Sequence, residues 1–204
     1  MVEQLPRLIV FSDTTRVAAM IMLERFTTLA ERARAGTIQF TLRDYALPVR
    51  QRWALAERLA ELTCRTGQWF AIAERADLAR AFGCRAFHLP QGGLSAADAR
   101  AYLGPDVVLS RGCHEPTAAS EADLGARLLS PIFEARKGRP ALGVGALASA
   151  CAAQPRAAWF ALGGVGAGNA ADCLAAGAAG VAVIGAALAA DPEPLLLALQ
   201  ISSR

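Results

Sequence analysis

Lysine is almost absent from this sequence of 204 residues: Lys137 is the only one, and every other basic residue is an arginine. A lysine that acts as a general base or forms a Schiff base therefore has a single candidate. There is no long basic run, and the basic residues are not interleaved with aromatic ones. Nucleic acid is therefore not expected as a partner.

Paired cysteines and targeting segments are also lacking. The five cysteines form no CxxC pair and no zinc-like spacing with the two histidines, so no metal site is expected and a reduced, cytoplasmic protein fits best. Leu8–Phe11 is too short for a signal-peptide core. Residues 173–190 carry no charge but are mostly alanine and glycine, which favours a buried strand with a flanking helix over a membrane span.

What is present is a repeated strand–helix unit. Short runs rich in Val, Ile, Leu and Phe alternate with stretches whose apolar residues recur at helical spacing. The eight runs are Arg7–Asp13, Thr37–Arg43, Trp69–Arg75, Ala86–Gln91, Val107–Gly112, Arg127–Phe133, Trp159–Val165 and Gly180–Gly185. Helices are expected near 17–34, 49–66, 76–82, 95–103, 116–124, 143–153, 168–176 and 187–200, two of them capped by Ser95 and Asn169.

This alternation predicts parallel strands joined by right-handed crossovers. Eight units close a barrel, whereas an open doubly wound sheet carries a glycine-rich turn after its first strand. Here the first strand ends in Phe11-Ser-Asp13, without glycine. The sequence therefore predicts an α/β fold with a single (β/α)8 TIM barrel domain over residues 1–204.

The active site of such a barrel forms at the C-terminal ends of its strands, and most polar residues of the apolar runs lie there. The candidates are Asp13, Arg43, Glu74, His88, Gln91, His114, Lys137, Gly163, Gly164 and Gly185. Glycines after strands seven and eight allow backbone N–H groups to approach a phosphate; the alternative is that Gly163 and Gly164 form only a tight turn. The ends together predict a site for a small phosphorylated ligand.

His114 follows the fifth strand, and an imidazole can both take and give a proton near neutral pH, so His114 is the acid/base candidate; a loop histidine bonded to the backbone is the alternative. His88, between two apolar residues, is expected to orient its neighbours. Arg43 needs a carboxylate or a phosphate, for which Asp44 or the substrate qualifies. Strand alternation turns Cys113 away from His114, so a Cys–His nucleophile is not expected.

Residues 136–139 place three cations beside a glycine, after strand six. This loop either closes over an anionic substrate or is simply solvated.

Taken together, the strand ends resemble the thiamine phosphate synthase superfamily, which includes thiamine phosphate synthase and the TenI-type thiazole tautomerase. The motifs are Phe11-Ser-Asp13, Thr41-Leu-Arg43, His88-Leu-Pro-Gln91, Cys113-His114, Ser130-Pro-Ile-Phe-Glu134 with Lys137, Leu162-Gly-Gly164 and Gly180-Val-Ala-Val-Ile184. The resemblance covers nearly the whole chain. It implies a (β/α)8 barrel and adds Ile184 to the substrate-binding residues.

The sequence departs from the synthase pattern where that reaction binds Mg²⁺ and pyrophosphate. Ala73-Glu74 replaces an Asn-Asp pair, Gly93 an aspartate, Tyr45 a pyrophosphate-binding lysine, and Glu134-Ala-Arg136 a threonine-rich turn. The loss of one of two magnesium carboxylates and of a cation argues against full synthase activity.

The tautomerase branch is the closer resemblance, because its fourth-strand loop is similar to Leu89–Ser95 and its proposed acid/base histidine matches His114. It implies a metal-free and cofactor-free isomerase that moves a proton on a carboxylated dihydrothiazole phosphate and so makes the ring aromatic. His114 transfers the proton, Arg43 binds the carboxylate, and Gly164 and Gly185 bind the phosphate. The remaining substrate contacts are Glu74, His88, Gln91, Lys137, Gly163 and Ile184.

The alternatives are a divergent, Mg²⁺-dependent synthase and a non-catalytic regulatory barrel that binds a phosphorylated ligand. Whether the chain forms a homo-oligomer stays open.

Overall fold

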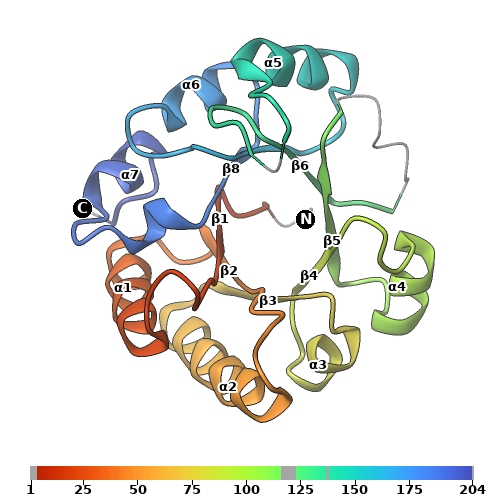
Figure 1. Cartoon of the computed structure of the whole chain (residues 1–204), viewed down its shortest axis with the longest axis vertical. Coiled ribbons are helices and arrows are strands. Elements are labelled where there is room, and N and C mark those ends of the chain that lie inside the picture. Colours follow the sequence, from red (N-terminus) through yellow and green to blue (C-terminus); the bar gives the residue numbers. More distant parts are fainter. Residues whose placement is uncertain (1–3, 116–122, 137, 204) are drawn as a thin grey trace.

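The computed structural model describes residues 4–115, 123–136 and 138–203. Eight parallel strands close into a barrel in chain order, and the helices surround it (Figure 1). The strands are β1 (Leu8–Phe11), β2 (Ile38–Leu42), β3 (Trp69–Ala73), β4 (Ala86–Leu89), β5 (Val108–Cys113), β6 (Ala126–Leu129), β7 (Trp159–Leu162) and β8 (Gly180–Val183). Each lies within one of the predicted apolar runs, except that β5 ends one residue after its run and β6 begins one residue before its run, so the (β/α)8 barrel is confirmed.

Most of the expected helices are present. They are α1 (Ala19–Arg32), α2 (Val49–Thr66), α3 (Ala76–Ala81), α4 (Ala96–Leu103), α5 (Gly143–Ala153), α6 (Ala170–Ala175) and α7 (Glu193–Ala198), with a 3₁₀ helix η1 (Gly185–Leu188) before α7. The Ser95 hydroxyl accepts a hydrogen bond from the Asp98 N–H, as the predicted cap of α4 should. The helix expected near 116–124 falls mostly outside the described residues.

The single helix predicted over 187–200 is wrong. The chain forms η1 and then α7, with Asp191 and Pro192 between them. Proline lacks an N–H and disfavours the helical region for the residue before it, so a helix cannot run through this point. The Asp191 carboxylate instead accepts from the Glu193 N–H, at 3.1 Å, where α7 begins.

The core is divided into separate clusters because successive strand residues face opposite sides of the sheet. Leu8 and Val10 belong to the large cluster that includes the buried faces of the helices, whereas Ile9 and Phe11 belong to a separate cluster with residues of β6, β7 and β8. Small residues such as Ala71 and Ala86 share a third cluster with Trp69. The interior is therefore filled by side chains, which leaves the strand ends as the place for a ligand.

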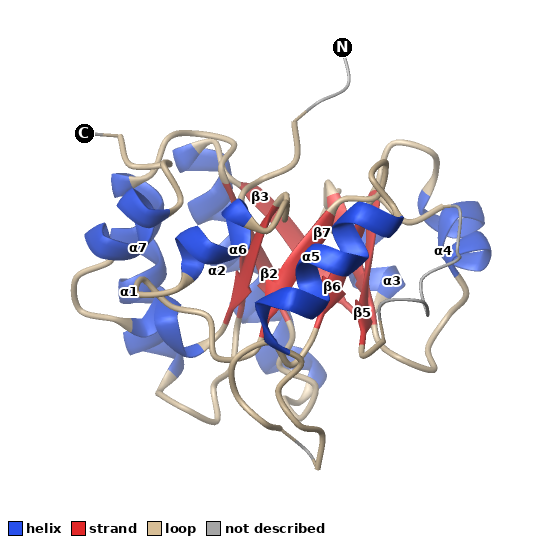
Figure 2. Cartoon of the chain, turned by 90° about the horizontal axis from the view of Figure 1, so that it is seen from above, coloured by secondary structure: helices blue, strands red, loops and turns tan. Residues whose placement is uncertain are grey.

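The two ends of the barrel differ. The described segments nearest the two chain ends lie on one side of it, and the loop between β6 and α5 extends on the other side, beyond the C-terminal ends of the strands (Figure 2). No helix within the described ranges is long and apolar enough to cross a membrane.

Candidate active site

A cavity of about 490 Å³ opens at the C-terminal ends of the strands. It brings together six of the predicted site residues: Arg43, His88, Gln91, His114, Gly163 and Ile184. Arg136 and Arg139 also line it, so three guanidinium groups face the cavity. None of its lining residues, which all belong to the described part of the chain, is an aspartate or a glutamate. This balance of charge suits an anionic ligand.

His114 has one ring nitrogen fixed by the fold. Its Nδ1 lies 2.8 Å from the Ser130 carbonyl oxygen at the end of β6, and 3.3 Å from the Ser130 hydroxyl. A carbonyl oxygen only accepts, so Nδ1 carries the hydrogen, and in the neutral ring Nε2 is the basic nitrogen. Gly112 and His114 line the cavity, while Cys113 is buried in the large cluster between the strands and the helices. The expected separation of Cys113 from His114 is confirmed.

His88 is held as a neutral ring. It is 8% exposed, its Nδ1 lies 3.0 Å from the Ser110 hydroxyl, and its ring meets Phe11 edge-on at 4.9 Å. Burial, with smaller contributions from the positive charges of Arg43 and Arg111, lowers the His88 pKa from 6.5 to about 3. These contacts support the predicted role of orienting neighbours.

The carboxylate partner of Arg43 is Asp13, and not Asp44 as suggested from the sequence. Arg43 Nη2 lies 3.3 Å from Asp13 Oδ2. Asp44 is buried and accepts from the hydroxyls of Ser12 and Thr14 instead. Arg43 also lies over the Phe11 ring at 5.8 Å, which fixes its guanidinium at the cavity wall.

A second cavity, of about 230 Å³, adjoins the first and shares Arg136, Leu162, Gly163 and Ile184 with it. The predicted phosphate residues Gly164 and Gly185 line it, together with Arg16. Gly163 and Gly164 have φ of 96° and 73°, and a Cβ on Gly164 would lie 2.7 Å from Glu134 Cγ. These two glycines are thus required by the turn and by the close approach of the β6 loop, whether or not a phosphate binds.

Asn169 has a different role from the one expected. Its side chain does not cap α6. Instead Oδ1 accepts from the Gly166 N–H at 2.9 Å, and Nδ2 donates to the Gly164 carbonyl at 3.0 Å. Asn169 therefore ties together the glycine loop that lines the smaller cavity.

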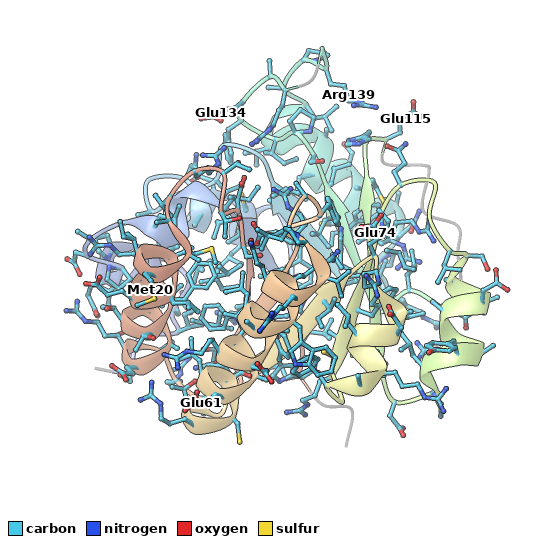
Figure 3. The ribbon with its side chains drawn as sticks, turned by 60° about the horizontal axis from the view of Figure 1, so that its bottom comes forward. Met20, Glu61, Glu74, Glu115, Glu134 and Arg139 are labelled. Carbon is cyan, nitrogen blue, oxygen red and sulfur yellow. The ribbon has the colours of Figure 1, made fainter. Side chains whose placement is uncertain are left out.

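In the cationic loop, the backbones of Arg136 and Arg139 pair in both directions, at 2.9 and 3.0 Å. Figure 3 shows Glu134 and Arg139 on this projecting loop. Lys137, a predicted substrate contact, lies outside the described residues.

Glu74 lies at the end of β3 but does not line either cavity. Its backbone is left-handed, with φ of 68°, and its half-exposed carboxylate lies 3.9 Å from the Arg52 guanidinium. Arg52 is 4% exposed, so this carboxylate balances a buried charge. The expectation that Glu74 contacts the substrate is therefore not supported by its position.

The residues present do not fit the Mg²⁺ site of a synthase. Glu74 is engaged with Arg52, and Gly93, at the position of the second carboxylate, lies in a turn where a Cβ would be 2.8 Å from the Pro90 ring. Within the described ranges there is no group of three or more His, Cys, Asp or Glu residues that could hold a metal ion.

Several residues of the site were not predicted as functional. Phe11, Tyr45 and Ser130 line the larger cavity, and Arg16 lines the smaller one. Phe11 and Ser130 lie at strand ends, where the same rule that selected His114 applies. Arg16 and Tyr45 lie in loops beyond the strand ends, where no periodicity indicates the direction of a side chain.

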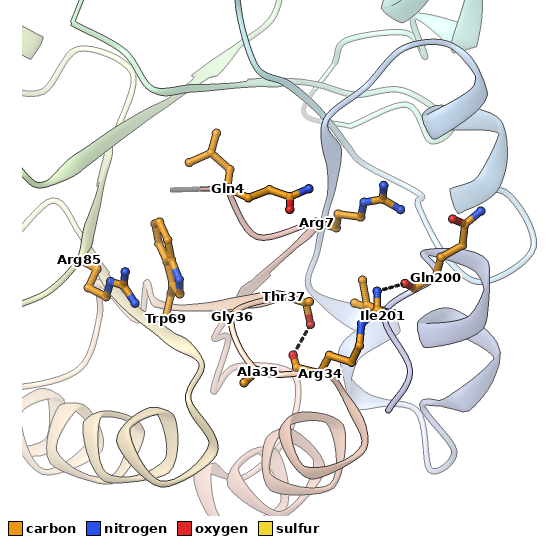
Figure 4. A pocket seen from close by; sticks show the side chains of 11 residues that line it. Gln4, Arg7, Arg34, Ala35, Gly36, Thr37, Trp69, Arg85, Gln200 and Ile201 are labelled. Carbon is orange, nitrogen blue, oxygen red and sulfur yellow. Dashed lines mark hydrogen bonds between the residues drawn. The ribbon is translucent and has the colours of Figure 1, made fainter. Parts of the chain in front are cut away.

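A further hollow of about 480 Å³ lies at the opposite end of the barrel, around Arg7, Arg34 and Trp69 (Figure 4). Arg7 donates to the Leu199 carbonyl and Arg34 to that of Gln200. These two arginines therefore attach the C-terminal segment to the barrel, and the hollow is remote from His114.

The fold and the site define a class: a (β/α)8 barrel whose strand ends form a cationic cavity around one fixed histidine. The sequence matches the thiamine monophosphate synthase family over residues 14–187, and the chain belongs to that family. It is 36% identical over 170 residues to the thiamine-phosphate synthase of Mycobacterium avium, covering 76% of each chain.

A thiamine-phosphate synthase of Thermus thermophilus is 35% identical over 185 residues, covering 87% of this chain and 89% of that one. A solved structure of a thiamine phosphate pyrophosphorylase from Pyrococcus furiosus has a TM-score of 0.81 at 21% identity, covering 97% of this chain and 96% of that one. The resemblance to the thiamine phosphate synthase superfamily is confirmed.

Proposed function

We propose that this chain is a thiamine-biosynthetic enzyme that isomerises a carboxylated dihydrothiazole phosphate by proton transfer, that is, a thiazole tautomerase. The observation that carries the proposal is His114, whose Nδ1 is fixed on the Ser130 carbonyl at 2.8 Å and which lines a cavity with three arginines. A fixed tautomer presents Nε2 as the base at the place where an anionic ligand fits.

In this mechanism the arginines bind and orient the substrate, and His114 transfers the proton. Arg43 pairs with the carboxylate of the substrate, and the smaller cavity takes the phosphate. Nε2 of His114 removes a proton from a ring carbon, and the resulting imidazolium returns it to a second carbon of the conjugated system, so the net reaction is an isomerisation. Stacking of the π system against the Pro131 and Ile184 walls of the cavity keeps the reacting atoms in place.

The second candidate is a thiamine phosphate synthase, which joins a thiazole phosphate to a pyrimidine pyrophosphate. Both relatives described above carry that name, so the comparisons favour it over the tautomerase. Against it stand Gly93, Tyr45 and the Glu74–Arg52 pair, where the synthase pattern has Mg²⁺ and pyrophosphate ligands.

Purified protein assayed with both substrate sets separates the two. We expect the dihydrothiazole carboxylate phosphate to be converted and the thiazole phosphate with pyrimidine pyrophosphate to give no thiamine phosphate. The reverse result would establish the synthase, and failure with both would favour a non-catalytic barrel.

Chelation gives an independent prediction. Because the described carboxylates do not form a Mg²⁺ site, EDTA should leave turnover of the dihydrothiazole substrate unchanged. The check is the initial rate with EDTA and with added Mg²⁺. A strong loss of activity that Mg²⁺ restores would overturn the tautomerase proposal in favour of the synthase.

Replacing Asn169 tests the phosphate half of the site. Asn169→Ala removes the two hydrogen bonds that order the glycine loop, each worth about 1 kcal/mol, so we expect binding of inorganic phosphate to weaken by up to about 30-fold. Titration calorimetry measures this. Ser95→Ala removes a hydrogen bond of similar strength at α4, outside both cavities, and should leave phosphate binding unchanged. Equal affinities in both variants would contradict the assignment.

A further inference from the structure

Arg16 lies in the loop between β1 and α1 and lines the smaller cavity, the proposed phosphate site. Its backbone N–H donates to the Asp13 carbonyl at 3.2 Å, which closes a turn just after β1. Its Nη1 lies 3.2 Å from where a Cβ on Gly185 would be. The guanidinium thus lies against the bare backbone of residue 185, where a larger residue would crowd it.

One carboxylate holds Arg16 and Arg43 together. Asp13 Oδ2 lies 3.4 Å from Arg16 Nε and 3.3 Å from Arg43 Nη2, while Oδ1 accepts from the Thr15 N–H at 3.2 Å and from the Thr15 hydroxyl. The Asp13 side chain is only 12% exposed. Burial alone would raise its pKa, but the Thr15 hydrogen bonds and the two arginines outweigh burial and lower it.

The charges of Asp13, Arg16 and Arg43 do not cancel. Two guanidinium groups share one carboxylate, so a net positive charge remains, divided between the two cavities. Arg16 contacts Asp13 through Nε, and its two terminal nitrogens keep donors for a further acceptor. Among the described residues, the charged ones that line the smaller cavity are Arg16, Arg136 and Glu134, so an anion there gains two cations against one carboxylate.

We propose that Arg16 is a phosphate-binding residue of this site, and that Asp13 is the positioning residue that sets Arg16 in the phosphate cavity and Arg43 in the neighbouring cavity at the same time. The inference rests on the proposed function for the nature of the ligand, a thiazole bearing both a phosphate and a carboxylate. With Arg16, the loop between β1 and α1 adds a side-chain cation to the smaller cavity, beside the glycine backbone and the loop after β6.

Equilibrium binding tests the role of Arg16 without reference to turnover. The probes are inorganic phosphate, hydroxyethylthiazole phosphate and the phosphate-free hydroxyethylthiazole, titrated calorimetrically into wild type and Arg16→Gln. Loss of a charge-assisted contact should weaken both phosphate-bearing probes by about 10- to 100-fold and leave the phosphate-free alcohol unchanged. The control is Arg32→Gln, which removes a similarly exposed arginine that pairs with Asp191 at 2.8 Å, outside both cavities; its affinities should equal those of wild type.

A double-mutant cycle tests Asp13. Asp13→Asn should weaken binding of the phosphate probe through Arg16 and of a thiazole carboxylate through Arg43. In the Asp13→Asn, Arg16→Gln double variant the phosphate effect should be less than the product of the two single effects, since both act through one guanidinium. Multiplicative effects, or Arg16→Gln binding phosphate as tightly as wild type, would overturn the inference. A protein that lacks tautomerase activity but shows this pattern would refute the proposed function alone.

Discussion

Replacing His114 with alanine is expected to lower kcat for the dihydrothiazole phosphate by about 10²- to 10⁴-fold, the usual contribution of a positioned acid/base group. Arg43 and the glycine loop remain in the variant, so its affinity for a thiazole phosphate should change little. The effect follows from the contact between Nδ1 and the Ser130 carbonyl, which makes Nε2 the nitrogen that exchanges the proton. Steady-state kinetics and calorimetric titration of the same samples measure the two quantities.

The neighbouring residue supplies the control for this experiment. Cys113 is buried in the large cluster between the strands and the helices, so Cys113→Ala should lower the free energy of unfolding while kcat stays near the wild-type value. If His114→Ala keeps near-full kcat, the proposed mechanism is wrong.

The sequence predicted the barrel well because parallel strands covered on both faces are continuous apolar runs, which stand out from the amphipathic helices. It also placed His114 and Arg43 at strand ends, where both line the larger cavity, since the carboxyl ends of parallel strands converge at one end of a barrel. The break before α7 was predictable too, because Pro192 and Pro194 are visible in the sequence. The helical spacing of apolar residues continues across both prolines, so periodicity alone predicts one helix there.

Other features depend on how side chains meet across strands, which one-dimensional patterns do not encode. Asp13 and Asp44 both follow strand ends, yet only Asp13 faces Arg43, while Asp44 turns to Ser12 and Thr14. Glu74 and His88 both lie near strand ends, but the Glu74 carboxylate pairs with the buried Arg52. The glycine pair Gly163–Gly164 is compatible with phosphate binding, but the close approach of the β6 loop requires glycine there even without a phosphate.

Acid is expected to destabilise the folded protein through His88. Its pKa is about 3 in the folded protein against an ordinary value of 6.5, chiefly because of burial. Between these two values the unfolded chain binds more protons than the folded one, so the free energy of unfolding rises with pH in this window and falls as the pH drops from 6.5 towards 3. The slope contributed by one such group approaches about 1.4 kcal/mol per pH unit.

Replacing His88 with glutamine removes this titrating group, so the variant should lose less stability on acidification than the wild type. At neutral pH, where His88 packs on Phe11 and contacts Ser110, the wild type should be the more stable of the two. The difference in their free energies of unfolding should then shrink between pH 6.5 and 4. Urea titrations at several pH values give both curves, and the other titrating groups cancel in the difference. Two curves that run parallel across this window would show that His88 is not held neutral by burial.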